Sequence, residues 1–473
     1  MSPPALLRSP DAALQDCADW FARLDAAIDQ SGVRDAEAHR LPGYPHLRSD
    51  RLLASFADDA AADRAKFADW LRALRDLDQL ARDIEIGNLP ATAVLALGVP
   101  DKATLHAVTS RCGNTLLAAE ANSAEAPLRL RTAARVPDSY ASALRAFGLY
   151  PLVSIPFLDG VQRWQQRTMA EFERQRTMPF DSTTAIRYVP APVNSQQEDA
   201  RTLLERVGRN ALGIPQLSAA ERDALLTAHA PAFEVDTRSD DDRPGTLVWR
   251  QDQLPAVAAA PPTVYRRVAF TRLGKSVLTQ LVYTIWFPRR TSSGGFDPIA
   301  GELDGVILRI TLDGAGRPLI ADSIHACGCY QQFFPGPRMT PRPAPETHLE
   351  WAFVPSPLPP LFPGARIFLR LAGATHYVTR IGATASLDGI RYVTADESSL
   401  RALRISGDTT RSLYGPDGLI AGSERGERFL FWPMGIASAG AMRQWGGQAT
   451  AFVGRRHFDD ADLLDRRFAL SGE

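Results

Sequence analysis

The spacing of apolar residues changes from helical to strand-like near Thr263, and this change constrains the fold most. Upstream, apolar residues recur every three or four positions, for example at Leu14, Cys17 and Phe21, as on one face of an amphipathic helix. Downstream, β-branched and aromatic residues gather in runs that are typical of strands and are separated by turns. The runs are Val264–Phe270, Val277–Phe287, Asp304–Leu312 and Leu319–His325, and the last one ends in a loop. The pattern predicts an α+β fold: a helical N-terminal bundle followed by a mainly antiparallel β-rich domain with C-terminal helices.

The same change suggests three regions along the chain. We expect an all-helical region over residues 1–178 and a mixed helical and strand connector over 179–262. The connector would end in an Ala/Pro-rich linker at Gln251–Pro262. A β-rich domain with terminal helices would occupy 263–473. Two prolines within Leu149–Phe157 predict that this apolar stretch is an extended connector.

Helices are expected at several further places, from apolar spacing and from N-cap residues. Ser218 and Glu221 have the spacing of a capping box. A short helix is expected after an N-cap at Ser49, and a longer one that starts at Pro100-Asp101. The other expected helices cover residues 11–31, 61–86, 137–148, 161–176, 196–209, 397–404, 423–430, 439–448 and 459–468.

Composition excludes several classes of function. The 473 residues are 45% hydrophobic and 23% charged, with a net charge of −1, so the chain has no global field that favours nucleic acid or an anionic membrane. No apolar run is long enough for a transmembrane helix. The start lacks the features of a signal peptide. We therefore expect a cytoplasmic protein by default, with a periplasmic or exported protein as the alternative if the start is trimmed or misassigned.

Two of the four cysteines fall on the apolar stripes of expected helices. Cys17 and Cys112 are far apart in sequence. They either form a disulfide that joins two helices or pack separately as thiols, and sequence alone leaves both alternatives open.

The other two cysteines belong to the stretch that most resembles a chemical site. His325, Cys327 and Cys329 occupy alternate positions, so in an extended chain they share one face. Two sulfurs and an imidazole are ligands that suit zinc or copper. The hypothesis is a metal-binding protein, with a metal-dependent hydrolase or oxidoreductase as its possible activity.

Such a site needs a fourth ligand from elsewhere in the chain. His348 and Glu346 in the proline-dense stretch Pro335–Pro363 are candidates, and so is His376 on the following hairpin. A long loop of this kind is often functional.

Two other interpretations of the motif remain open. In the first, Cys327 or Cys329 acts as a nucleophile or the two form a thiol redox pair, with His325 lowering a thiol pKa. In the second, the protein is not an enzyme, the motif is core, and the chain binds a small molecule or a protein partner. Substrate, reaction, metal identity and oligomeric state do not follow from the sequence.

Two acidic stretches are expected to be structural. Asp240, Asp241 and Asp242 are interpreted as a solvated turn rather than a calcium site. Glu302 and Asp304 are interpreted as a solvated hairpin entry rather than a pair of catalytic acids.

Overall fold

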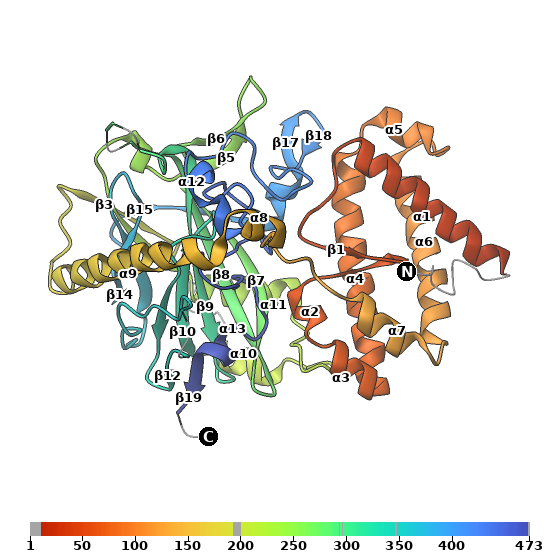
Figure 1. The fold of residues 1–473 in the computed structure, drawn as a ribbon, viewed down its shortest axis with the longest axis horizontal. Helices are drawn as coiled ribbons and strands as arrows, with labels where there is room; N and C mark the ends of the chain where they lie inside the picture. The colour runs from red at the N-terminus through yellow and green to blue at the C-terminus, as the bar shows by residue number, and fades with distance from the viewer. Residues whose placement is uncertain (1–10, 193–199, 293, 296, 346–347, 472–473) are drawn as a thin grey trace.

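The computed structural model confirms the α+β fold. It describes residues 11–192, 200–292, 294–295, 297–345 and 348–471. Helices from the N-terminal part of the chain gather on one side of the molecule, and the sheets formed by the later part lie on the other side (Figure 1). None of the described helices is both long enough and apolar enough to cross a bilayer.

Three long helices organise the N-terminal part: α1 (Ala12–Gln30), α4 (Arg64–Asn88) and α6 (Lys102–Ala121). Each begins after an aspartate that accepts a backbone hydrogen bond, which satisfies an amide with no partner inside the helix. The shorter elements around them are β1 (His39–Leu41), β2 (Tyr44–Ser49), α2 (Arg51–Ala54), α3 (Ala57–Ala62), α5 (Ala91–Ala96), α7 (Ala126–Ala133) and α8 (Ser142–Phe147).

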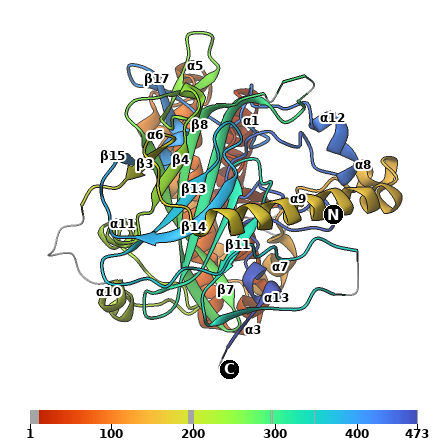
Figure 2. The ribbon, with the colours of Figure 1, turned by 90° about the vertical axis from the view of Figure 1, so that its left-hand side faces the viewer.

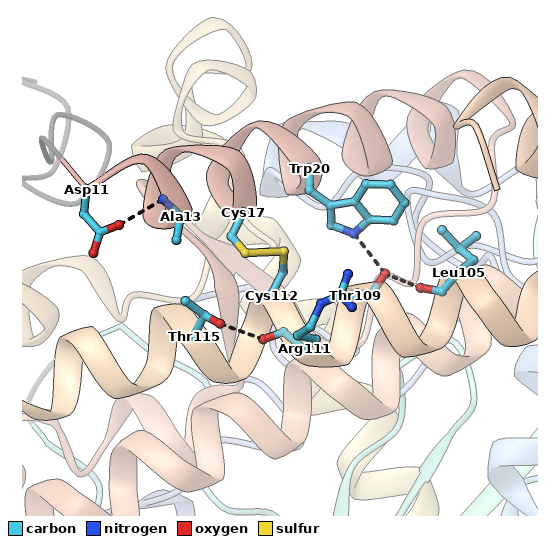
Figure 3. Close-up of a disulfide and its surroundings, with 9 residues drawn as sticks. All are labelled: Asp11, Ala13, Cys17, Trp20, Leu105, Thr109, Arg111, Cys112 and Thr115. Atoms are coloured by element: carbon cyan, nitrogen blue, oxygen red, sulfur yellow. Dashed lines mark hydrogen bonds between the residues drawn. A yellow bond between two sulfur atoms is a disulfide. The ribbon is translucent and has the colours of Figure 1, made fainter.

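A disulfide joins two of these long helices. Cys17 on α1 and Cys112 on α6 are bonded, with their Cα atoms 4.9 Å apart (Figure 3). Next to it, the indole of Trp20 donates a hydrogen bond of 3.2 Å to the hydroxyl of Thr109. Of the two alternatives left open by the sequence, the structure therefore has the disulfide.

The larger of the two main sheets has six described strands, in the order β11-β10-β9-β8-β7-β16. From β7 to β11 consecutive strands pair antiparallel, while β16 pairs parallel with β7. The strands are β7 (Thr263–Leu273), β8 (Ser276–Arg290), β9 (Gly301–Leu312), β10 (Pro318–His325), β11 (Gln332–Pro335) and β16 (Val393–Asp396).

The second sheet has five described strands and packs against the first. Its order is β14-β13-β4-β3-β15, with β3 (Ala185–Val189), β4 (Ala232–Asp236), β13 (Arg366–Leu371), β14 (Val378–Thr384) and β15 (Ile390–Arg391). Alternate residues of β8 and β9, such as Tyr283 and Leu308, share one hydrophobic core with Leu369 of β13. The β-rich part is therefore two sheets packed face to face.

The expected connector at Leu149–Phe157 is wrong, because this stretch is helical. It forms the start of α9 (Tyr150–Gln175), which includes both Pro151 and Pro156. Pro151 lies in the first turn, where its missing N–H costs no helical hydrogen bond. Although the predicted helical region includes α9, this helix crosses the β-rich part beside β14 (Figures 1 and 2).

The predicted linker at Gln251–Pro262 is also partly strand. It contains β6 (Pro255–Ala258), which pairs antiparallel with β5 (Thr246–Trp249). The helix expected at 196–209 is α10 (Ala200–Arg206), and residues 196–199 of that prediction lie outside the described residues. The Ser218 capping box is confirmed at the start of α11 (Ala219–Ala228). The three region boundaries stay predictions.

Of the helices expected near the C-terminus, only short segments form. In their place are short pieces: η3 (Glu397–Ala402), α12 (Arg428–Phe431), η4 (Trp432–Met434) and α13 (Leu463–Arg467). Residues 439–448 form no helix. Gly435, Gly440 and Gly446 have φ near +80°, a left-handed conformation that interrupts a right-handed helix. The remaining short strands are β12 (Met339–Pro341), β17 (Leu403–Ser406), β18 (Thr409–Arg411) and β19 (Phe468–Leu470).

Candidate functional site

The strand that contains His325 ends at this residue, as expected. His325, Cys327 and Cys329 therefore do not share one face of an extended chain. A turn follows over residues 326–328, in which Gly328 has φ +98°. A Cβ at Gly328 would lie 2.5 Å from the carbonyl oxygen of Ala449, so only glycine fits this turn without rearrangement. The turn separates the histidine from the two cysteines.

His325 lies at one end of the space between the two sheets. It pairs with Val306 on β9, which belongs to the core shared by both sheets. Asp304, two residues before Val306, therefore faces the same side. From the other sheet, the turn between β13 and β14 brings His376, and the 3₁₀ turn η2 (Asp240–Asp242) brings Asp242.

These four side chains form one buried network of hydrogen bonds and ion pairs. Asp304 Oδ1 lies 3.2 Å from His325 Nδ1, and Asp304 Oδ2 lies 2.9 Å from His376 Nδ1. His376 Nε2 lies 3.4 Å from Asp242 Oδ1. Arg425 adds a contact of 3.3 Å to Asp304. Buried charges need such partners, because an unpaired charge away from water is very costly.

The network shifts the pKa values of its two histidines in opposite directions. Burial would lower the pKa of His376, but hydrogen bonds to Asp242 and Asp304 outweigh it and raise that pKa. Burial lowers the pKa of His325, against the opposing effect of Asp304. Burial would raise the pKa of Asp304, yet His325 and Arg425 hold it well below its ordinary value. The network therefore favours a charged His376 and a neutral His325.

The expectation that Asp242 and Asp304 are solvated is wrong, because both are fully buried. Burial would raise the pKa of Asp242, but hydrogen bonds from His376 and from the amides of Ala374, Arg238 and Ser239 lower it to about 2. For Asp304 the sequence does contain a signal. Asp304 occupies an inward-facing position of β9, and the next inward-facing residues are Val306 and Leu308. A carboxylate in such a series needs a buried partner.

Two tyrosines connect this network to a nearby pocket. The rings of Tyr330 and Tyr377 are centred 5.0 and 5.8 Å from His325, and 4.6 Å from each other. Arg290 donates a hydrogen bond of 2.9 Å to the Tyr377 hydroxyl and lies over both rings. Among the described residues, none bonds to Nε2 of His325.

The two cysteines of the motif are free thiols beside each other. Cys327 is buried in a hydrophobic cluster that also contains Ile324 and Ala326, on the opposite face of the sheet from His325. Cys329 is half-buried and lines the pocket. A hydrogen bond from the Cys329 thiol lowers the pKa of Cys327, against the effect of burial.

The predicted metal ligands are not brought together. Within the described ranges, no group of three or more His, Cys, Asp and Glu side chains is arranged to hold a metal ion. His325 and His376 both direct Nδ1 at Asp304. His348 is exposed, and Glu346 lies outside the described residues. The metal site on His325, Cys327, Cys329, His348 and His376 is therefore not supported.

The pocket has a volume of about 500 Å³ and lies between α9, the turn after β10 and the C-terminal segment 427–456. From α9 it is lined by Phe157, Gly160, Val161 and Trp164, whose spacing of three, four and seven places them on one helical face. The helix expected at residues 161–176 includes Val161 and Trp164, but the start of this face was missed because an extended connector was expected at residues 149–157.

Seven aromatic side chains of the pocket wall form two groups. We call Phe157, Phe431 and Phe452 the phenylalanine triad; their ring centres are 5.0 to 6.1 Å apart. The second group is centred on Trp164, which contacts Tyr330, Phe353 and Tyr377 at 5.3 to 6.4 Å. The remaining lining residues are Pro156, Gly160, Val161, Gln165, Ile299, Cys329, Gln331, Glu350, Trp351, Glu427, Ile436, Ala449, Thr450, Ala451 and Arg456.

Comparison with known proteins adds no family to this description. No family model, no curated protein and no solved structure matches the chain.

Proposed function

We propose that the chain binds a small, largely apolar molecule in the pocket between α9 and the turn after β10. The observation that carries the proposal is the aromatic wall, built from α9, the β10 turn and the C-terminal segment. Small-molecule sites typically enclose about 300–1,000 Å³ and combine apolar walls with a few polar groups. A pocket of about 500 Å³ falls within this range.

The buried network supports the proposal because it fixes part of the wall. Tyr330 and Tyr377 contact His325, which is held in turn by Asp304. Arg290 holds the Tyr377 hydroxyl. Aromatic walls fixed in this way bind without first losing side-chain entropy, so less of the binding free energy is lost to ordering.

A titration with the neutral fluorescent probe N-phenyl-1-naphthylamine tests the proposal. We expect saturable binding at one site in the wild type. In Gly160→Phe, the new ring projects into the pocket from a position whose Cβ has free space, and the affinity should fall by about tenfold or more. The matched control is Ala170→Phe, an exposed position further along α9.

Two results would count against ligand binding. One is the absence of saturable binding in the wild type. The other is equal affinity of the probe for Gly160→Phe and Ala170→Phe, which would locate the probe elsewhere.

A thiol redox role is the second candidate, favoured by the adjacent free thiols of Cys327 and Cys329. A disulfide substrate would accept two electrons and two protons from the pair and leave as two thiols, while the cysteines form a disulfide. Incubation with oxidised glutathione and mass spectrometry tests this. A loss of two hydrogens in the peptide containing both cysteines supports it, and unmodified thiols contradict it.

The disulfide between Cys17 and Cys112 favours the exported alternative over the cytoplasmic default, because disulfides persist in oxidising compartments. Cell fractionation of the natural host tests this inference. Recovery of the protein only from the cytoplasm, with both cysteines reduced, would contradict it.

A further inference from the structure

Glu427 is a buried acidic residue of the pocket wall, and no described side chain forms an ion pair with it. Its side chain is 3% exposed and lines the pocket. It precedes α12 but makes no capping hydrogen bond, and no described residue donates a hydrogen bond to its carboxylate. A buried carboxylate in this state is unfavourable, and burial raises the pKa of Glu427, against the effect of nearby arginines.

The other charges on the pocket wall neutralise each other. Glu350 accepts hydrogen bonds from the amides of Phe452 and Val453 and lies 3.8 Å from Arg456. Arg456 also donates to Thr450. These groups are therefore already satisfied, and the unbalanced charge of the wall is that of Glu427.

The arginines nearest to Glu427 are also engaged elsewhere. Arg425 donates to the carbonyl oxygens of Ile299 and Leu303 and contacts Asp304. Arg290 bonds to Tyr377 and lies over its ring. These fixed contacts leave the carboxylate of Glu427 without a direct ion pair in the described part of the chain.

Phe431, one member of the phenylalanine triad, follows Glu427 by one helical turn. The amide of Phe431 donates a hydrogen bond to the backbone carbonyl of Glu427, so the two residues begin and end one helical turn and have the spacing of neighbours on a helical face. Over the described residues, no arginine or lysine lies against the rings of Phe157, Phe431 or Phe452. Their faces carry negative charge density and attract cations.

We propose that the ligand of this pocket is an organic cation, an ammonium group with apolar substituents, whose charge lies between Glu427 and the phenylalanine triad. This inference rests on the proposed function, because it names the chemical class of the bound molecule. A carboxylate without an ion pair, beside aromatic rings that have no cation over them, is the combination that recognises an ammonium better than a neutral molecule of the same shape.

Two probes of nearly identical shape test the proposal. Phenyltrimethylammonium carries a positive charge, and tert-butylbenzene has carbon in place of the charged nitrogen. Each competes against N-phenyl-1-naphthylamine on the full chain. For the wild type we expect the cation to bind about tenfold more tightly or better. In Glu427→Gln, which keeps the size of the side chain, the two affinities should lie within about threefold of each other.

Glu424→Gln is the matched control, because it removes the same charge from an exposed position of the same segment. It should keep the wild-type preference. Equal or tighter binding of tert-butylbenzene by the wild type would overturn the cation proposal and leave ligand binding intact. A cation preference that survives in Glu427→Gln would also overturn it. If neither probe displaces the dye and the dye itself does not bind, both proposals fail.

Discussion

Removal of the disulfide between Cys17 and Cys112 should destabilise the helical part of the molecule. The bond connects α1 to α6 across a sequence separation of 95 residues. In the chain-entropy model, a crosslink of this span lowers the entropy of the unfolded chain by an amount worth about 4.7 kcal/mol at 25 °C. Measured values are usually smaller, so for Cys17→Ala combined with Cys112→Ala we expect a loss of about 2–4 kcal/mol in the free energy of unfolding.

Urea unfolding followed by far-ultraviolet circular dichroism measures this effect, because α1, α4 and α6 contribute much of the helical signal. The double variant should unfold at a lower urea concentration than the wild type. Dithiothreitol should shift the wild type by a similar amount and leave the variant unchanged. The stabilising role of this disulfide is refuted if the double variant unfolds at the same urea concentration as the wild type and dithiothreitol does not shift the wild type.

Three further substitutions test other parts of the structure. Asp304→Asn should lower the free energy of unfolding by about 3–5 kcal/mol in urea titrations, because it leaves Arg425 buried without its counter-charge. Since the folded-state pKa of Asp304 is depressed, its stabilisation is complete above about pH 4 and decreases as the pH falls further, and this pH dependence should be absent from the variant. If Asp304→Asn has the same acid-unfolding profile as the wild type, the stabilising role of Asp304 in the network is contradicted. Gly328→Ala should lower the melting temperature, because its Cβ would meet the Ala449 carbonyl. Gly160→Ala lies inside α9, where a Cβ has free space, and should raise the free energy of unfolding by about 0.5–1 kcal/mol. Equal effects of the two glycine substitutions on stability would contradict the difference between the two sites.

Local patterns were sufficient to predict much of the fold. Helix α1 and the start of α6 follow from their apolar spacing and from N-cap aspartates. Strands β7 to β10 follow from β-branched runs separated by strong turns. These signals depend only on residues close in sequence, so they survive in the folded chain.

The errors arose where distant contacts or positions within an element decide the outcome. Pro151 is compatible with α9 only because it falls in the first turn. Asp242 appears solvated in sequence, but residues of another turn bury it beside His376. The motif at His325 was correctly placed at a strand end, yet the turn at Gly328 separates the histidine from the thiols. The pocket combines α9 with segments more than 150 residues away, and no local pattern indicates such a meeting.

A crystal structure of the protein grown with N-phenyl-1-naphthylamine tests the central claim most directly. We expect the probe to occupy the space between Trp164 and the phenylalanine triad, in contact with α9 and with the turn that contains Cys329. Density for the probe at any other place, or an unoccupied pocket at saturating probe, would contradict the proposal that this chain binds small molecules there.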